Sequence, residues 1–167
     1  MTIAYAALST TLRIGSSAKI ASSDWDIHFE NLNLVTNASG NTGTVITPAQ
    51  IQPNTTQISG LVVDLKKPGD SVSYTFDIVN DGDINAKLGS LVLATPNCGS
   101  NQSACSKLEY YVRYTTGGTT PQVGDTLNKN TSINATLTVK YKENDPVSTE
   151  NDVSVSGLSV TFLYNQN

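Results

Sequence analysis

The sequence contains a single histidine, His28, which lies between Ile27 and Phe29 in an alternating run of apolar and polar residues. A Ser/His/Asp triad or a Cys/His pair would have to use this residue. No GxSxG, HExxH or phosphate-binding glycine motif accompanies it. One histidine cannot build a two-histidine zinc site. We therefore predict a non-enzymatic protein with no catalytic residue, no metal ligand set and no cofactor, and we expect His28 to be an exposed polar residue of a strand.

Two acidic clusters contain the oxygen ligands that calcium prefers. In the first, Asn80, Asp81 and Asp83 surround Gly82; the second lies near the C-terminus and contains four residues, namely Glu143, Asp145, Glu150 and Asp152. The Asp81-Gly82 pair is also typical of a tight hairpin turn, in which glycine takes a positive φ. The second cluster is typical of a solvated charged loop. We interpret both clusters as turns and not as metal sites.

The two cysteines, Cys98 and Cys105, frame the polar loop CGSNQSAC. In an oxidising compartment they would close a small ring, whereas in a cytosol they would more often be metal ligands or free thiols. No nearby histidine completes a zinc site. We predict a Cys98–Cys105 disulfide, which stabilises the fold by about 2–3 kcal/mol in the chain-entropy model.

Aromatic residues and glycosylation sequons could give the surface a binding role. Tyr110 and Tyr114 follow the same alternation as Leu108 and Val112 and are expected in the core, which leaves Tyr111 facing outward. The sequence has five Asn-x-Ser/Thr sequons, at Asn37, Asn54, Asn101, Asn130 and Asn134. Whether any of them carries a glycan stays open.

The composition is that of an exported β-protein. The chain has 167 residues, of which 14% are charged, and a net charge of −4. Its largest basic cluster is Lys66-Lys67, so the sequence predicts no nucleic-acid partner. No stretch approaches the roughly 20 apolar residues of a transmembrane helix, so we expect no membrane contact in the mature form.

The clearest element is the stretch 71–89. Apolar residues alternate with polar ones before and after the Asp81-Gly82 turn: Val72, Tyr74, Phe76 and Ile78, then Ile84, Ala86 and Leu88. This alternation predicts two half-buried strands joined as an antiparallel hairpin.

The same alternation recurs between Gly, Pro and Asn turns, which predicts strands in these ranges: 24–30, 44–51, 58–65, 91–93, 108–114, 133–141 and 153–164. The alternation changes parity near Asn31, which predicts a β-bulge, and Pro48 restricts its strand to a sheet edge. Residues 115–130 are expected to form a loop. Nine or ten strands predict an all-β fold, a two-sheet antiparallel sandwich of jelly-roll or immunoglobulin-like type, with residues 22–167 as a single domain.

An extended segment, residues 7–21, precedes this domain, and three of its apolar residues share one face: Leu8, Leu12 and Ile14. Ala4-Tyr5-Ala6 has the small-x-small form that signal peptidases recognise. On one interpretation residues 1–6 are the remnant of a signal peptide or an added leader, and the natural mature chain begins at Ala7. On the other, they are ordinary strand residues.

Four blocks resemble, in order, a family of exported proteins processed by a SipW-type signal peptidase, the TasA/camelysin-like family: AYAALSTTLRIGSSAKI, DWDIHFEN, LKKPGDSVSYTFDIVNDGDINAKL and VSVSGLSVTFLYNQN. The resemblance implies a jelly-roll sandwich that assembles by donor-strand complementation, with Leu8, Leu12 and Ile14 of the N-terminal strand inserted into the next subunit. Members have also been described as metalloendopeptidases, but this chain lacks HExxH. Its cysteine loop is a departure from the family.

These observations predict a secreted, non-enzymatic subunit of an extracellular biofilm-matrix fibre or pilus-like filament, whose partner is a second copy of itself, joined head to tail. The first alternative is a monomeric surface-binding sandwich, either adhesin-like or carbohydrate-binding, in which the N-terminal strand folds back on its own domain. The second is a secreted metallopeptidase.

Overall fold

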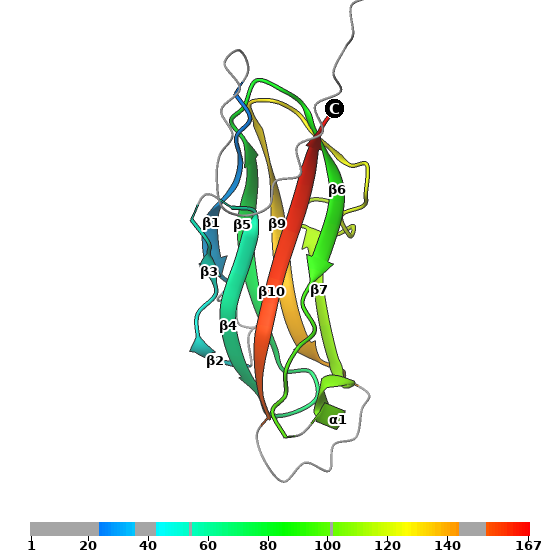
Figure 1. The fold of residues 1–167 in the computed structure, drawn as a ribbon. Coiled ribbons are helices and arrows are strands. Elements are labelled where there is room, and N and C mark those ends of the chain that lie inside the picture. The colour runs from blue at the N-terminus through cyan, green and yellow to red at the C-terminus, as the bar shows by residue number, and fades with distance from the viewer. Residues whose placement is uncertain (1–23, 36–42, 54, 101, 144–152) are drawn as a thin grey trace, which may run out of the picture.

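The computed structural model describes residues 24–35, 43–53, 55–100, 102–143 and 153–167. Within these ranges, ten strands form two antiparallel sheets packed face to face (Figure 1). The predicted all-β, two-sheet antiparallel sandwich is therefore confirmed. The expected donor residues Leu8, Leu12 and Ile14 lie outside the described residues, as do all other residues of 1–23.

The four-stranded sheet has the order β1–β5–β9–β7. Its strands are β1 (Ile27–Leu34), β5 (Ser71–Asn80), β9 (Thr131–Tyr141) and β7 (Leu108–Tyr114). The second sheet has the order β2–β4–β10–β6–β8, and β3 also pairs with β4. Its strands are β2 (Thr44–Thr47), β3 (Gln50–Ile51), β4 (Gln57–Leu65), β10 (Val153–Gln166), β6 (Ala86–Leu93) and β8 (Thr126–Leu127). A four-residue helix, α1 (Gln102–Cys105), lies in the cysteine loop.

The core lies between the two sheets, and the alternation of buried residues is clearest in the central strand β5. In β5 the buried residues are the alternating apolar ones that the sequence indicates, Val72, Tyr74, Phe76 and Ile78. Three rings from three strands meet at the centre: Phe29 lies 4.9 Å from Phe76 and 5.5 Å from Phe162 between ring centroids. Burial of this apolar surface is the main favourable term that holds the sheets together.

Two irregularities predicted from the sequence are confirmed. The β1–β5 register shifts between Glu30 and Asn33, and Asn31 has a φ of 53°, so the bulge lies where the parity changes. The predicted strand 44–51 is divided at Pro48 into β2 and β3, both of which pair only with β4 and therefore lie at the sheet edge. The predicted loop 115–130 contains the two-residue strand β8.

The predicted hairpin of residues 71–89 is wrong. Strands β5 and β6 belong to different sheets, so the turn between them carries the chain from one sheet to the other. Gly82 has no positive φ; a Cβ at this position would lie 2.5 Å from the backbone oxygen of Asp24 and 2.8 Å from the nitrogen of Asp26. The glycine is needed because the chain that enters β1 passes directly against the turn, not because a hairpin requires an unusual backbone angle.

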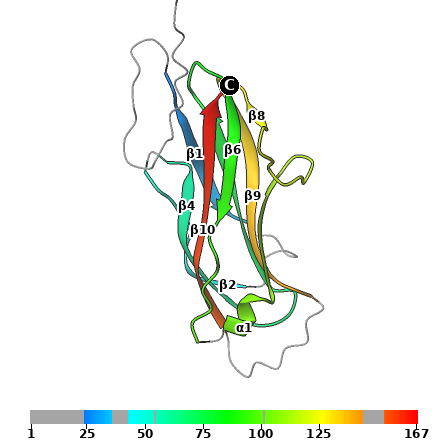
Figure 2. The same ribbon diagram turned by 45° about the vertical axis from the view of Figure 1, so that its right-hand side comes forward.

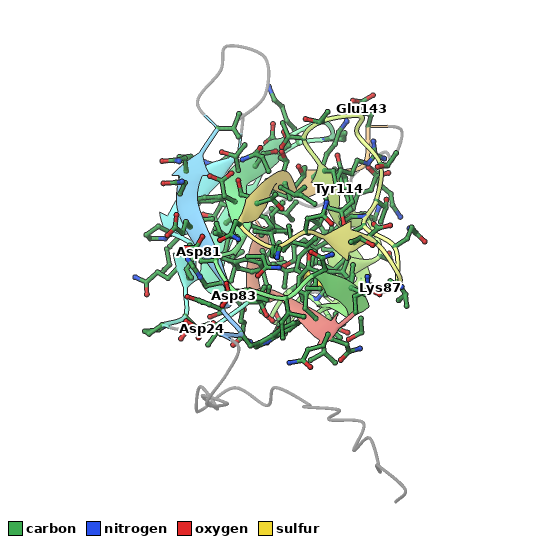
Figure 3. All side chains as sticks on the ribbon, turned by 90° about the horizontal axis from the view of Figure 1, so that it is seen from above. Asp24, Asp81, Asp83, Lys87, Tyr114 and Glu143 are labelled. Atoms are coloured by element: carbon green, nitrogen blue, oxygen red, sulfur yellow. A yellow bond between two sulfur atoms is a disulfide. The ribbon has the colours of Figure 1, made fainter. Side chains whose placement is uncertain are left out.

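The segment before β1 is held to this turn by backbone hydrogen bonds. The N–H of Asp81 donates to Asp26 and the N–H of Asp83 donates to Asp24, at 3.0 and 2.9 Å. Figure 3 shows Asp24, Asp81 and Asp83 together at this end of the sandwich.

Within the described part of the chain, no helix is long and apolar enough to cross a membrane.

Candidate functional site

The single histidine lies on the outer face of β1 between two carboxylates. Its Nδ1 is 2.8 Å from Asp26 Oδ1, and its Nε2 is 3.1 Å from Glu30 Oε1. The side chain is only 22% exposed, less than the sequence indicates, because the acidic neighbours flank the ring. Burial lowers the pKa of His28, but the hydrogen bonds to Asp26 and Glu30 outweigh it and raise the pKa above its ordinary value.

Asp81, which in the sequence belongs to the acidic cluster with Asp83, lies close to His28 in the structure. One ligand atom from each of Asp26, His28 and Asp81 lies within 4.8 Å of the others. Both ring nitrogens are already within hydrogen-bond distance of carboxylates, as expected for a protonated imidazole held between two acids. A metal ion would have to displace the hydrogen bonds between His28 and the two carboxylates. We therefore interpret the cluster as an ion-pair network at the start of β1. Alternation alone did not reveal it, because Asp81 is distant in sequence.

The predicted Cys98–Cys105 disulfide is present, with a Cα–Cα distance of 5.9 Å. It closes the loop that connects β6 to β7, and α1 lies inside this ring. Cys98 is buried at the end of the sandwich, and an Asn97–Ser156 bridge ties the residue before it to β10. The disulfide therefore fixes the connection between the edge strands of the two sheets.

The tyrosines of β7 have the predicted orientation. Tyr110 and Tyr114 pack against the core, whereas Tyr111 lies on the outer face with the Arg113 guanidinium 4.8 Å from its ring centroid. Burial raises the pKa of Tyr110, whose hydroxyl is buried with no hydrogen-bond partner among the described residues. Burial, together with a 2.9 Å hydrogen bond to Asp125, raises the pKa of Tyr114.

Two of the five sequons lie in described residues. Asn130 is exposed and has a φ of 55°. The Nδ2 of Asn134, the atom that a glycan would occupy, instead donates to the Phe76 carbonyl at 3.2 Å and to Asp77 Oδ1 at 2.7 Å. Asn134 is therefore a poor glycan acceptor. Asn37, Asn54 and Asn101 lie outside the described residues.

The least protected part of the core lies along the second half of β6. Strand β8 pairs only with Ala86 and Lys87, and beside it Ala86 and Leu88 are almost completely buried, at 0% and 1% exposure. Beyond β8, two leucines face the same core: Leu91 is opposite the buried Phe162, and Leu93 is opposite the buried Val160. Both are only partly buried. Among the described residues, no strand pairs with β6 beyond β8, so none covers these two leucines on that side.

The second half of β6 and the edge strand β7 lie on the same side of the sandwich (Figure 1), and Figure 2 shows β6 next to β10 when that side is turned forward. Toward one end the two sheets are joined by the β7–β8 loop: Gly124 N–H donates to the Leu88 carbonyl at 2.7 Å, and the Tyr114 hydroxyl donates to Asp125. At the other end the disulfide loop joins them. We call the part of β6 and its extension between these two closures, residues Gly89–Thr95, the open β6 edge.

Comparisons with protein-family models, curated proteins and solved structures give no match. The resemblance to the TasA/camelysin-like family therefore stays a prediction from sequence blocks, and function has to be argued from the geometry above.

Proposed function

We propose that this protein is a non-enzymatic structural subunit of an extracellular fibre, which polymerises when the N-terminal segment of one copy adds as a strand to the sandwich of the next. The observation that carries this proposal is the open β6 edge, where inward-facing Leu91 and Leu93 are only partly buried and no described strand pairs with β6 beyond β8. Residues 7–14 supply an apolar face of the kind that would cover them, formed by Leu8, Leu12 and Ile14.

Strand addition explains why such an edge would be kept. An extended peptide bound at a sheet edge gains main-chain hydrogen bonds, and its alternate apolar side chains set the register. When donor and acceptor lie on different surfaces of one chain, the contact is head to tail, and it produces filaments when the rotation between successive copies does not close a ring. No second protein is needed for assembly.

The disulfide supports an extracellular location. Disulfides persist in oxidising environments and are rare in reducing cytosols. Within the described residues no cysteine is free, and the one bridge lies in the β6–β7 loop, next to the end of the proposed acceptor. Biofilm matrix is the extracellular setting that the family resemblance implies.

The two alternatives have less support in the geometry. A carbohydrate platform around Tyr111 would need an open aromatic face, but Arg113 lies over that ring. A metallopeptidase would need a histidine ligand with a free nitrogen, but both nitrogens of His28 lie beside carboxylates.

The deciding experiment compares two purified forms, one that begins at Ala7 and one that begins at Gly15, by negative-stain electron microscopy and size-exclusion chromatography. We expect filaments from the first form and folded monomers from the second. Thermal unfolding followed by circular dichroism checks that the shorter form keeps its sandwich. A monomeric first form together with an unstable second form would show that the segment belongs to its own domain and would overturn the proposal.

A further inference from the structure

We infer that the open β6 edge, residues Gly89–Thr95, is the acceptor for residues 7–14 of a second copy, and that the other three sheet edges are not. This inference rests on the proposed function, because it names the partner surface of the same assembly. It comes from a comparison of how each edge of the two sheets is protected.

The other three edges carry features that discourage strand addition. Natural sheets protect their edges with outward charges, bulges, prolines and very short strands. The outer face of β1 carries Asp26, His28 and Glu30 at or beside the strand, which also has the bulge at Asn31. The outer face of β7 carries Glu109 and Arg113. The edge formed by β2 and β3 is short and is divided at Pro48.

The open β6 edge has no charged residue. Its sequence is GSLVLAT, and its outward-facing Val92 is 57% exposed, one of the most exposed large apolar side chains in the described residues. The nearest charge on β6 is Lys87, which lies beside β8 and therefore outside the open part. An edge without protection is a hazard for a monomer, so its presence favours a strand that normally covers it.

The backbone of this edge is oriented for pairing. The N–H of Ala94 donates to Ser159 of β10, so in the same antiparallel register Val92 also forms its ladder bonds with β10. Leu91 and Leu93, the alternate residues, then direct their N–H and C=O groups away from β10. No described residue pairs with them on that side.

Length and side-chain spacing fit the chosen occupant. The open β6 edge spans seven residues, and the segment 7–14 spans eight, of which only Arg13 is charged. Leu12 and Ile14 are two residues apart, as are Leu91 and Leu93, so both pairs can face the same core in adjacent strands. The pairing is bounded by the β7–β8 loop at Leu88 and by Pro96, which has no N–H to donate.

A matched pair of edge substitutions tests the assignment in the full chain. Val92→Lys adds a charge at the open β6 edge, and Ile46→Lys adds the same charge at β2, where the side chain is 54% exposed. Both positions are solvent-facing, so both variants should fold. We expect Val92→Lys to raise the critical concentration for filament formation by about tenfold or more, and Ile46→Lys to leave it within about twofold. Normal assembly of Val92→Lys, or a larger effect of Ile46→Lys, would overturn the inference.

Photo-cross-linking separates this inference from the proposed function. A benzophenone amino acid replaces Val92 in full-length chains, which are mixed as ordinary and ¹⁵N-labelled protein before irradiation and mass spectrometry. Cross-links from position 92 to residues 7–14 that join light to heavy chains would support both conclusions.

If filaments form but position 92 captures other residues, the acceptor is wrong and the fibre function stands. If only cross-links within one chain form, the edge is correct but the segment folds back, and polymerisation by exchange is wrong. If neither filaments nor such cross-links form, both are overturned.

Discussion

The environment of His28 predicts how the stability of the sandwich depends on pH. Burial lowers the pKa of His28, but the hydrogen bonds to Asp26 and Glu30 have the larger combined effect and raise it above its ordinary value. Because the folded state then binds the proton more tightly than the unfolded chain, the histidine contributes stability that is fully present below the unfolded pKa of about 6.5. That contribution is lost as the pH rises through the folded pKa.

An NMR titration of the imidazole gives the direct measurement, because the chain has a single histidine. We expect a titration midpoint above that of the denatured protein. Asp26→Asn should lower the midpoint, whereas Asp24→Asn, at a residue that meets the β5–β6 turn through its backbone carbonyl, should change it less. A midpoint at or below the denatured value would show that desolvation dominates.

The completely buried Asn80 should be among the least replaceable polar residues. Its Nδ2 donates to the carbonyls of Ile84 and Leu127 at 2.9 and 3.2 Å, and its Oδ1 accepts from Gly82 N–H at 3.1 Å. Asn80→Ala leaves these backbone groups without their partner at a buried position. We expect a loss of about 2–4 kcal/mol in the free energy of unfolding. Urea unfolding measures it, and Asp83→Ala, at an exposed neighbour, is the control with an expected effect below about 0.5 kcal/mol.

At the level of elements, the sequence is most informative where burial alternates and least informative about which strands pair. The alternation of β5 follows from one buried face, so Val72 and Phe76 were correctly placed in the core. The same local pattern cannot distinguish a turn that returns to its own sheet from one that crosses to the other. The Asp81-Gly82 pair therefore suggested a hairpin, while the true constraint, contact with the chain at Asp24, is remote in sequence.

The candidate acceptor illustrates the same limit. The apolar spacing of Leu91 and Leu93 identifies a strand, but nothing in it shows that β8 stops after pairing with Ala86 and Lys87. Edge positions depend on where every other strand ends, which is a property of the assembled sheet. The disulfide is predictable, because two cysteines separated by a short polar loop, with no histidine nearby, make a poor metal site.

The disulfide loop should stabilise the connection between β6 and β7 to a measurable extent. The bridge closes a short loop, for which the chain-entropy model gives about 2–3 kcal/mol. We expect the double variant Cys98→Ser, Cys105→Ser to lose about 2–3 kcal/mol of its free energy of unfolding. Its midpoint of urea unfolding should therefore be lower than that of the oxidised wild type. Wild-type protein treated with dithiothreitol is the matched comparison and should behave like the variant. Equal urea midpoints for the oxidised and reduced proteins would contradict the prediction.

On the scale of the whole molecule, the described chain begins at a different part of the sandwich from the proposed acceptor. The described chain starts at Asp24, whose backbone carbonyl accepts a hydrogen bond from the N–H of Asp83 in the β5–β6 turn. Strand β6 begins near that turn and runs away from it, so the open β6 edge lies toward the other end (Figure 1). A segment that precedes Asp24 and an acceptor that lies farther along the sandwich favour exchange between successive copies, stacked along the long axis of the fold.

If Leu12 is buried in the acceptor of a neighbouring copy, a charge at that position must prevent assembly. Leu12→Asp would place a carboxylate against the inward face of Leu91 and Leu93, where an unpaired charge costs several kcal/mol or more. Thr11→Asp carries the same charge on the opposite face of the segment and is the matched control. We expect electron microscopy to show filaments from Thr11→Asp and none from Leu12→Asp, with the same thermal unfolding for both because neither residue belongs to the ten described strands. Equal loss of filaments in both variants would indicate that assembly is sensitive to any charge on the segment, whichever face carries it. Normal filaments from Leu12→Asp would show that this leucine is not inserted at all.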